Sequence, residues 1–179
     1  MQQVVTGGQS MNPSTAQLLE AVEAVPAPEV VILPNNKNII AVAEQVDALT
    51  DKTVRVLPTR SITEGFAALL AYDPQSTAEA NVAAMREHAQ AVVNGEVTQA
   101  VRDSACDAGP IAEGDWLGIS RDGIQVVAPD LDDAACQLLD RLLEDHELVT
   151  IIEGDGASPG CTRHITQWLE EHHPEVEAE

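Results

Sequence analysis

The stretch VVILPNNKNIIAV, residues 30–42, joins a continuous apolar run to a helical pattern through a polar turn. Val30–Leu33 has the length of a buried strand, and the apolar residues from Ile39 onward recur at helical spacing. The same order occurs around two other apolar runs, Gln3–Thr6 and Val54–Leu57. Short apolar strands that alternate with helices predict a parallel sheet covered on both faces. We therefore expect an α/β fold in the first half of the chain.

Three serines mark the expected helix starts in this half. A serine followed three residues later by glutamine or glutamate is a capping box, in which each side chain bonds to the other residue's backbone. The boxes are Ser14 with Gln17, Ser61 with Glu64, and Ser76 with Glu79. The helix after Ser61 is expected to run through Phe66, Leu69 and Leu70, and the helix after Ser76 is expected to run to about Val93.

The pattern changes at Asn94-Gly95, where we place the boundary between two lobes of one compact domain, residues 1–95 and 96–179. The first lobe carries the parallel strand–helix repeats, and the second is predicted to be mixed α+β with a β-hairpin. Its expected elements are a strand at 96–104, a hairpin at 116–127 around Gly123, a helix at 131–143, a strand at 148–152, a helix at 159–172 and a last strand beginning at 175–177.

Composition narrows the possible partners. Nine basic and thirty acidic residues give a formal net charge of −21, which repels nucleic acid and anionic membrane surfaces. No apolar run approaches the roughly 18 residues that suggest a membrane span. Three separate cysteines, without a CxxC pair or a signal peptide, favour a reducing cytoplasmic location.

The strand-to-helix junctions form the candidate binding site. Carboxyl ends of parallel strands share one edge of a sheet, where α/β proteins bind ligands. Glycines, amides and the first-turn NH groups of helices could hold a carboxylate or phosphate there. Each loop taken singly fits ordinary caps and turns better, and it is the occurrence of three similar loops at one edge that makes a pocket an equal alternative. The residues selected are Gly7, Gly8, Gln9, Asn12 and Ser14 in the first junction, Asn35, Asn36, Lys37 and Asn38 in the second, and Thr59 and Arg60 in the third.

Other motifs are weaker. Cys161 and His164 are three residues apart on a predicted helix, which would suit a metal-dependent hydrolase, but zinc sites usually need three or four protein ligands. The glycine-rich segment 154–160 lacks dinucleotide spacing and is interpreted as a turn followed by a helix capped by Ser158. His172 and His173 are interpreted as a solvated helix end. No complete catalytic constellation is visible, so no catalytic residue or metal ligand is assigned.

Four strings, TGGQSMNPSTAQLLEAV, VVILPNNKNI, VRVLPTRSITEGFAALLAYDP and GEVTQAVRDS, resemble the C-terminal region of the ATP-binding subunit of fatty acid kinase. This family is also described as dihydroxyacetone (glycerone) kinase-like, or as containing a DhaL-type domain. The resemblance covers nearly the whole chain and implies a fragment of a larger ATP-dependent kinase. ATP and magnesium would bind an N-terminal helical barrel that these 179 residues do not contain. The kinase site and its cofactors are therefore expected outside this chain.

The same region is similar to the DegV family of fatty-acid-binding proteins, which implies a DegV-like first lobe. Where that family has a threonine–serine pair and then paired serines, this chain has Gly7-Gly8 and Asn35-Asn36, so fatty-acid binding does not carry over. The resemblance implies a non-catalytic domain that docks a fatty-acid-carrying DegV-type partner or mediates assembly, including a possible homodimer. Asn36 and Arg60 are the residues expected to make any retained contact. The alternative is a module that binds a small phosphate or carboxylate at the junctions.

Overall fold

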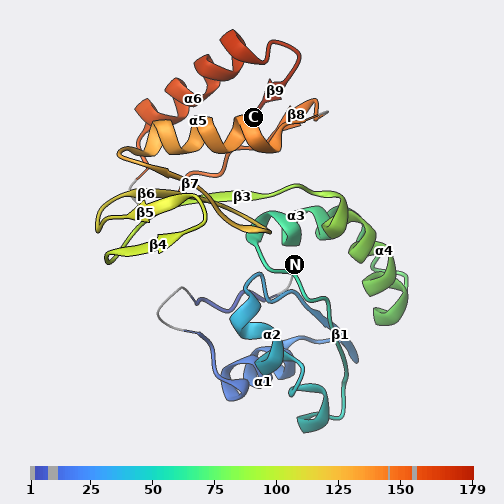
Figure 1. The fold of residues 1–179 in the computed structure, drawn as a ribbon. Helices are drawn as coiled ribbons and strands as arrows, with labels where there is room; N and C mark the ends of the chain where they lie inside the picture. Colours follow the sequence, from blue (N-terminus) through green and yellow to red (C-terminus); the bar gives the residue numbers. More distant parts are fainter. Residues whose placement is uncertain (1–2, 8–11, 145, 155–156) are drawn as a thin grey trace. The chain divides into compact units, whose positions relative to one another are not determined.

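The computed structural model describes residues 3–7, 12–144, 146–154 and 157–179. The chain divides into two compact units, Met1–Val93 and Asn94–Glu179. Each unit has its own hydrophobic clusters, and Figure 1 shows the helices and strands that build them.

The first unit is built around two short parallel strands. β1 and β2 pair in register from Glu29 opposite Thr53 to Ile32 opposite Val56, and a helix makes the crossover that parallel pairing requires. The described elements are, in order, α1 (Thr15–Ala24), β1 (Glu29–Ile32), α2 (Lys37–Ala43), the 3-10 helix η1 (Asp47–Leu49), β2 (Thr53–Val56), α3 (Ile62–Leu70) and α4 (Ala78–Ala91).

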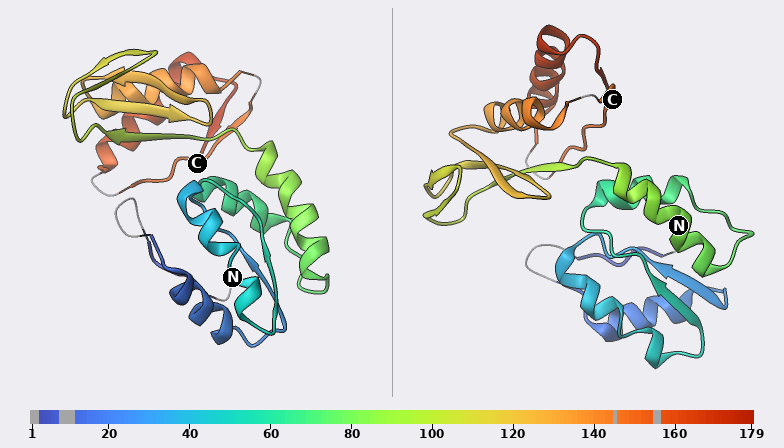
Figure 2. Two further views of the ribbon diagram at one scale, coloured as in Figure 1. Left: turned by 60° about the horizontal axis from the view of Figure 1, so that its bottom comes forward. Right: turned by 45° about the vertical axis from the view of Figure 1, so that its right-hand side comes forward.

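Helices cover both faces of this small sheet. Figure 2 shows α1 and α2 on one side of the strands and α3 and α4 on the other. Leu18 of α1 and Ile39 of α2 pack in one cluster with Val54 of β2. Leu57, just after β2, packs in the opposite cluster with Met85 of α4. The two-sided cover agrees with the apolar runs of both strands.

The predicted alternation of strands and helices is confirmed from α1 to α4, but the strand predicted at Gln3–Thr6 is wrong. Residues 3–7 form an irregular, exposed segment, and Val4 is 66% exposed. The described residues therefore contain small parallel and antiparallel sheets and no long parallel sheet. An apolar run of four residues indicates strand propensity, whereas pairing depends on a neighbouring strand that propensity does not specify.

Two of the three predicted helix starts occur at the expected serine, and the Ser14–Gln17 box has both of its bonds. The Ser14 and Ser61 side chains accept bonds from the amides three residues on and cap α1 and α3. The third box is wrong, because α4 begins one residue later with Thr77 as its cap. The Ser76 hydroxyl instead donates to Asp73. That bond, after the larger effect of the Gln75 amide, lowers the pKa of Asp73.

The second unit combines a three-stranded antiparallel sheet, ordered β3–β6–β7, with two two-stranded sheets, one formed by β4 and β5 and the other by β8 and β9. β4 and β5 pair antiparallel, whereas β8 and β9 pair parallel. Its described elements are β3 (Gly95–Gln99), β4 (Ser104–Cys106), β5 (Gly109–Ile111), β6 (Trp116–Ser120), β7 (Gly123–Ala128), α5 (Leu131–Leu142), β8 (Leu148–Val149), α6 (Pro159–His172) and β9 (Glu177–Ala178).

The mixed α+β character and the hairpin of this unit are confirmed. β6 and β7 turn through two residues, and Gly123 has a φ of +112°, which glycine adopts readily. The helix at 159–172 is confirmed, with Ser158 as its cap and Pro159 at its first position. The single strand predicted at 96–104 is wrong, because β3 ends at Gln99 and a second hairpin, β4–β5, begins at Ser104.

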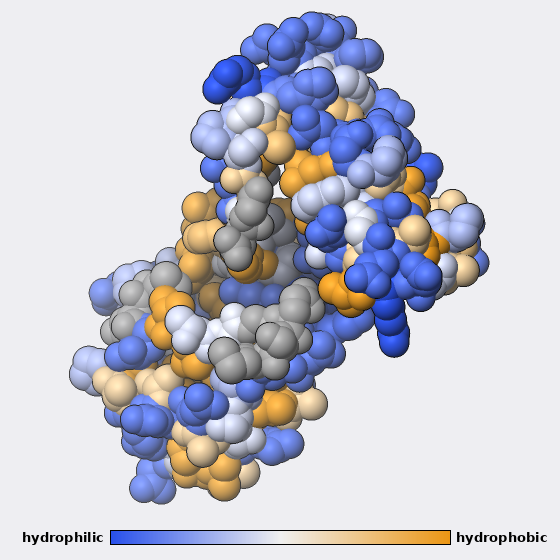
Figure 3. All heavy atoms as spheres, turned by 90° about the vertical axis from the view of Figure 1, so that its left-hand side faces the viewer, coloured by the Kyte–Doolittle hydropathy of each residue, from blue (hydrophilic) through white to orange (hydrophobic). Residues whose placement is uncertain are grey.

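On the face of the molecule that Figure 3 draws, hydrophilic residues are interspersed with hydrophobic ones. Among the described residues, none of the helices has both the length and the apolar character needed to cross a bilayer.

Candidate functional site

Two of the three predicted junctions meet at the carboxyl ends of β1 and β2. The Asn35 amide donates to Thr59 Oγ1 over 3.0 Å, and the Thr59 hydroxyl donates to Asn35 Oδ1 over 2.8 Å. We call these residues the Asn35–Thr59 pair. Because Thr59 is only 1% exposed, these two hydrogen bonds lie inside the protein and not on a ligand-facing surface. The parallel register of β1 and β2 brings the two loops together.

The Asn35–Thr59 pair rests directly on the first turn of α3. Asn35 has a φ of +54°, a left-handed conformation that asparagine tolerates better than most residues. A Cβ built on Gly65 would lie 2.3 Å from Asn35 Oδ1, closer than atoms can approach. Gly65 therefore provides the space in which the Asn35 side chain lies.

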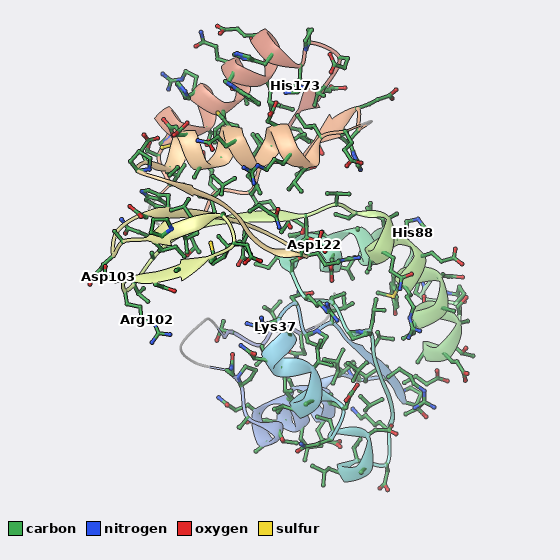
Figure 4. The ribbon with its side chains drawn as sticks, in the orientation of Figure 1. Lys37, His88, Arg102, Asp103, Asp122 and His173 are labelled. Carbon is green, nitrogen blue, oxygen red and sulfur yellow. The ribbon has the colours of Figure 1, made fainter. Side chains whose placement is uncertain are left out.

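The remaining residues of these two junctions form local caps. Asn36 caps α2 through a 2.9 Å bond from the Asn38 amide to its Oδ1. Lys37 and Asn38 are exposed, and Figure 4 shows Lys37 at the start of α2. The Arg60 side chain is also exposed, while its backbone amide donates to Glu64 Oε2 over 2.7 Å. Glu64 is itself 5% exposed, so its carboxylate helps to fix the turn before α3.

The first junction is not brought to the other two by any hydrogen bond of the described residues. Ser14 pairs with Gln17 as a capping box, and Asn12 and Gly7 are exposed. Gly8 and Gln9 lie outside the described residues. The contacts at β1 and β2 thus make a packed, internally bonded corner. A shallow surface depression lies elsewhere, along α4 from Glu79 to Gln90.

Sequence reasoning missed an exposed apolar surface on α3. Ile62, Phe66 and Leu70, which we call the α3 stripe, are 58%, 55% and 84% exposed. Their spacing of four residues places them on one side of the helix. Phe66 and Leu70 lie outside the core because the buried side of α3 carries the small residues Gly65 and Ala68. A sequence signal existed: α3 is apolar around nearly its whole circumference, more than one buried face requires.

Residues 1–179 match, over their whole length, the FakA-like C-terminal family, which is named for the C-terminal part of a fatty acid kinase protein. The chain belongs to this family. It corresponds to the C-terminal part of FakA-like fatty acid kinase proteins, as the sequence resemblance indicated.

Longer bacterial proteins contain this FakA-like domain. Protein YloV of Bacillus subtilis (strain 168) is 41% identical over 177 residues, which are 98% of the chain and 32% of YloV. An uncharacterized protein of Staphylococcus aureus (strain USA300) is 37% identical over 177 residues, with the same coverage of 98% and 32%. The chain thus spans about a third of the length of these relatives.

The cysteine and histidines of α6 in this FakA-like domain do not form a metal centre within the described residues. Cys161 lies at the start of α6, with its Sγ 3.3 Å from Ser158 Oγ. His164 is exposed one turn further along the helix. The described part of the chain contains no group of three or more potential metal ligands.

The interpretation of both terminal histidines of α6 as solvated is wrong for His173. Trp168 stacks on His172 with ring centroids 5.0 Å apart, and its ring lies 5.2 Å from that of His173. His173 Nε2 lies 3.5 Å from Asp140 Oδ1 of α5, and the side chain is 20% exposed. Figure 4 shows His173 where α6 ends. This cluster holds the end of α6 beside α5 and therefore has a structural explanation.

Cys136 of α5 should be the least reactive of the three thiols. It is 7% exposed, and its burial, followed by the charges of Asp132, Asp133 and Asp130, raises its pKa to about 11. The thiolate population near pH 8 is then roughly a hundredfold below that of an ordinary cysteine. We expect iodoacetamide to label native Cys136 about a hundredfold more slowly than urea-unfolded Cys136, as followed by mass spectrometry.

Cys161, which is half-buried, is the internal control for this labelling, and similar native rates for the two thiols would contradict the prediction.

The raised pKa of Cys136 also makes the stability of the domain depend on pH. The folded state holds the Cys136 proton more tightly than the unfolded chain, and this difference stabilises the folded state. The stabilisation is complete below about pH 8.5, the ordinary pKa of a cysteine. It is lost as the pH rises toward about 11.

Proposed function

We propose that this domain is a non-catalytic docking module of a fatty acid kinase, and that it binds the DegV-type protein that carries the fatty acid. In the longer protein, ATP and magnesium would be bound outside residues 1–179, and phosphate transfer would take place there. The family match supports the kinase context. The docking role rests on the surface of the first unit.

The observation that carries the proposal is the α3 stripe. Three large apolar side chains on one helix, each more than half exposed, are unfavourable in water unless something covers them. Aromatic residues such as Phe66 are enriched at the centres of protein interfaces. α3 also begins directly after Arg60, so the stripe adjoins the third predicted junction. A partner that covered α3 would lie beside Arg60.

The hydrogen bonding of the junctions also favours a protein partner over a small anion. The Asn35–Thr59 pair, the Asn36 cap and the Ser14 box use their polar groups within the chain. An anion would need these donors, and releasing them from existing bonds would reduce its binding energy. Phosphate or carboxylate binding is therefore the second hypothesis for these loops.

Calorimetric titration tests the docking proposal. The probe is a purified DegV-type protein loaded with a long-chain fatty acid, titrated into the domain and into a Phe66→Ser variant. We expect the variant to bind about 10- to 100-fold more weakly, because it loses an apolar contact near the centre of the interface. Phe66 is 55% exposed, so the free energy of unfolding should change by no more than about 0.5 kcal/mol.

Leu49→Ser is the matched control, because Leu49 is 57% exposed but lies on η1, away from α3. It should bind like the unaltered domain. The double variant Asn36→Ala/Arg60→Ala tests whether the interface extends to the junctions, in which case it should bind the DegV-type protein more weakly than the unaltered domain. Equal affinity of the Phe66 and Leu49 variants would remove the stripe from the interface. Heat with inorganic phosphate, and none with the protein, would favour the small-anion alternative.

A further inference from the structure

The two edges of the β1–β2 sheet are finished differently. On the outer side of β2, the Val54 amide donates to Asp47 Oδ1 over 2.9 Å, and the Val54 carbonyl accepts from Arg55 Nη1 over 2.9 Å. Arg55 Nη1 also lies 3.6 Å from Asp47 Oδ1. These two charged side chains bond both outward-facing backbone groups of Val54. A further strand cannot pair with β2 there without displacing them.

On the outer side of β1, no described side chain bonds the outward-facing backbone groups in this way. The Thr53 amide donates to the Pro28 carbonyl and the Leu57 amide to the Ile32 carbonyl, so the even-numbered residues of β1 face β2. Backbone direction alternates along a strand, which turns the amides and carbonyls of Val31 and Leu33 to the other side. Within the described residues, these outward groups have no hydrogen-bond partner.

Burial separates the two strands only at Val54. Val54 of β2 is 2% exposed, whereas Val56 of β2 is half-buried, as are Val30, Val31 and Ile32 of β1 and Leu33 just after it. Strands inside a parallel sheet are normally buried on both faces by helices and flanked on both edges. The side chains of Val31 and Leu33 already pack against the cluster of α3 and α4. β1 thus has the side-chain packing of an interior strand and the backbone of an edge strand, and unpaired backbone groups beside apolar residues are costly.

The described amino-terminal residues do not fill this edge. Residues 3–7 form no strand, and Val4 remains 66% exposed. A second copy of the domain is also disfavoured, because each copy carries a formal net charge of −21. The longer relatives contain other segments that could supply a strand for this edge, since about two thirds of YloV lies outside the matched region.

We propose that the outer edge of β1 is a strand-addition site, filled in the longer proteins of this family by one extended apolar segment from the rest of the same polypeptide. The added strand runs parallel to β1, because the existing pairing is parallel and helices already cover both faces. It bonds to the Val31 and Leu33 backbone groups and makes β1 an interior strand. This inference is independent of the docking role of α3.

Residue-resolved amide hydrogen exchange tests the proposal in two proteins, the chain of residues 1–179 and full-length YloV. In the chain, the Val31 and Leu33 amides should exchange at least about a hundredfold faster than the Leu57 amide, which is bonded to Ile32. In YloV, the corresponding amides should be as protected as the counterpart of Leu57. The Val54 amide, which Asp47 holds, is the matched control and should be protected in the chain.

Three results would overturn the proposal. Protection of Val31 and Leu33 in a dilute sample of the chain would mean that its own residues fill the edge. Protection that appears only as the chain is concentrated would mean that a second copy fills it. Fast exchange at both corresponding positions of YloV would mean that no strand is added in the longer protein.

Discussion

A Gly65→Ala variant should lose up to about 2 kcal/mol of unfolding free energy, although alanine is the better helix former. Helix propensity alone favours alanine over glycine by about 1 kcal/mol in a helix interior. The new Cβ, however, would lie 2.3 Å from Asn35 Oδ1. Asn35 cannot turn away without breaking its bond from Thr59, and overpacking of this kind typically costs about 1–3 kcal/mol. The steric effect should therefore decide the sign.

Urea unfolding followed by circular dichroism gives this difference, and Asn35→Gly supplies the control. Glycine adopts the φ of +54° without strain, and its amide can still donate to Thr59. In the Asn35→Gly background, Gly65→Ala should be neutral or stabilising, which gives a coupling energy of about 1–3 kcal/mol between the two sites. A stabilising Gly65→Ala in the unaltered chain would show that Asn35 does not occupy this space.

Leu57→Ala should have the largest effect of the substitutions considered, a loss of about 2–5 kcal/mol from the unfolding free energy. Leu57 is 2% exposed and packs with Ala68, Val82 and Met85 between the sheet and the helices α3 and α4. Truncation removes this burial and leaves a cavity that its neighbours fill only in part. Because domains of this size have unfolding free energies of about 5–15 kcal/mol, the first unit should lose a large part of its unfolding free energy.

The control for this variant is Leu49→Ala, since Leu49 is 57% exposed and should change stability by about 0.5 kcal/mol or less. Circular dichroism follows the helices of both units, while tryptophan emission reports the second unit, which contains Trp116 and Trp168. Comparing the two signals assigns the change to the first unit. Equal losses for Leu57→Ala and Leu49→Ala would contradict the assignment of Leu57 to the core.

Local features of the fold could be predicted from the sequence, while features that depend on a distant neighbour could not. The caps at Ser14, Ser61 and Ser158 involve residues three apart, so the sequence contains both partners. The strand expected at Gln3–Thr6 fails because strand formation depends on pairing with another segment. Ser76 fails as a cap because Asp73 competes for its hydroxyl.

The candidate site shows the same division. The meeting of the Asn35 and Thr59 loops follows from adjacent parallel strands, and it was predictable once β1 and β2 were recognised. The bonds between Asn35 and Thr59, and the packing of Asn35 on Gly65, could not be predicted. They depend on how α3 approaches the sheet. The α3 stripe was not predicted, because it depends on α3 packing closely through the small residues Gly65 and Ala68, which leaves the larger residues outside.

The unequal edges of the β1–β2 sheet also bear on aggregation. Charged side chains along a strand edge, such as Asp47 and Arg55 beside Val54, commonly prevent edge-to-edge pairing of strands from different molecules. β1 has no comparable protection at Val31 and Leu33 among the described residues. The isolated domain therefore has an aggregation-prone side at β1, and repulsion between molecules of net charge −21 opposes fibril growth from that side.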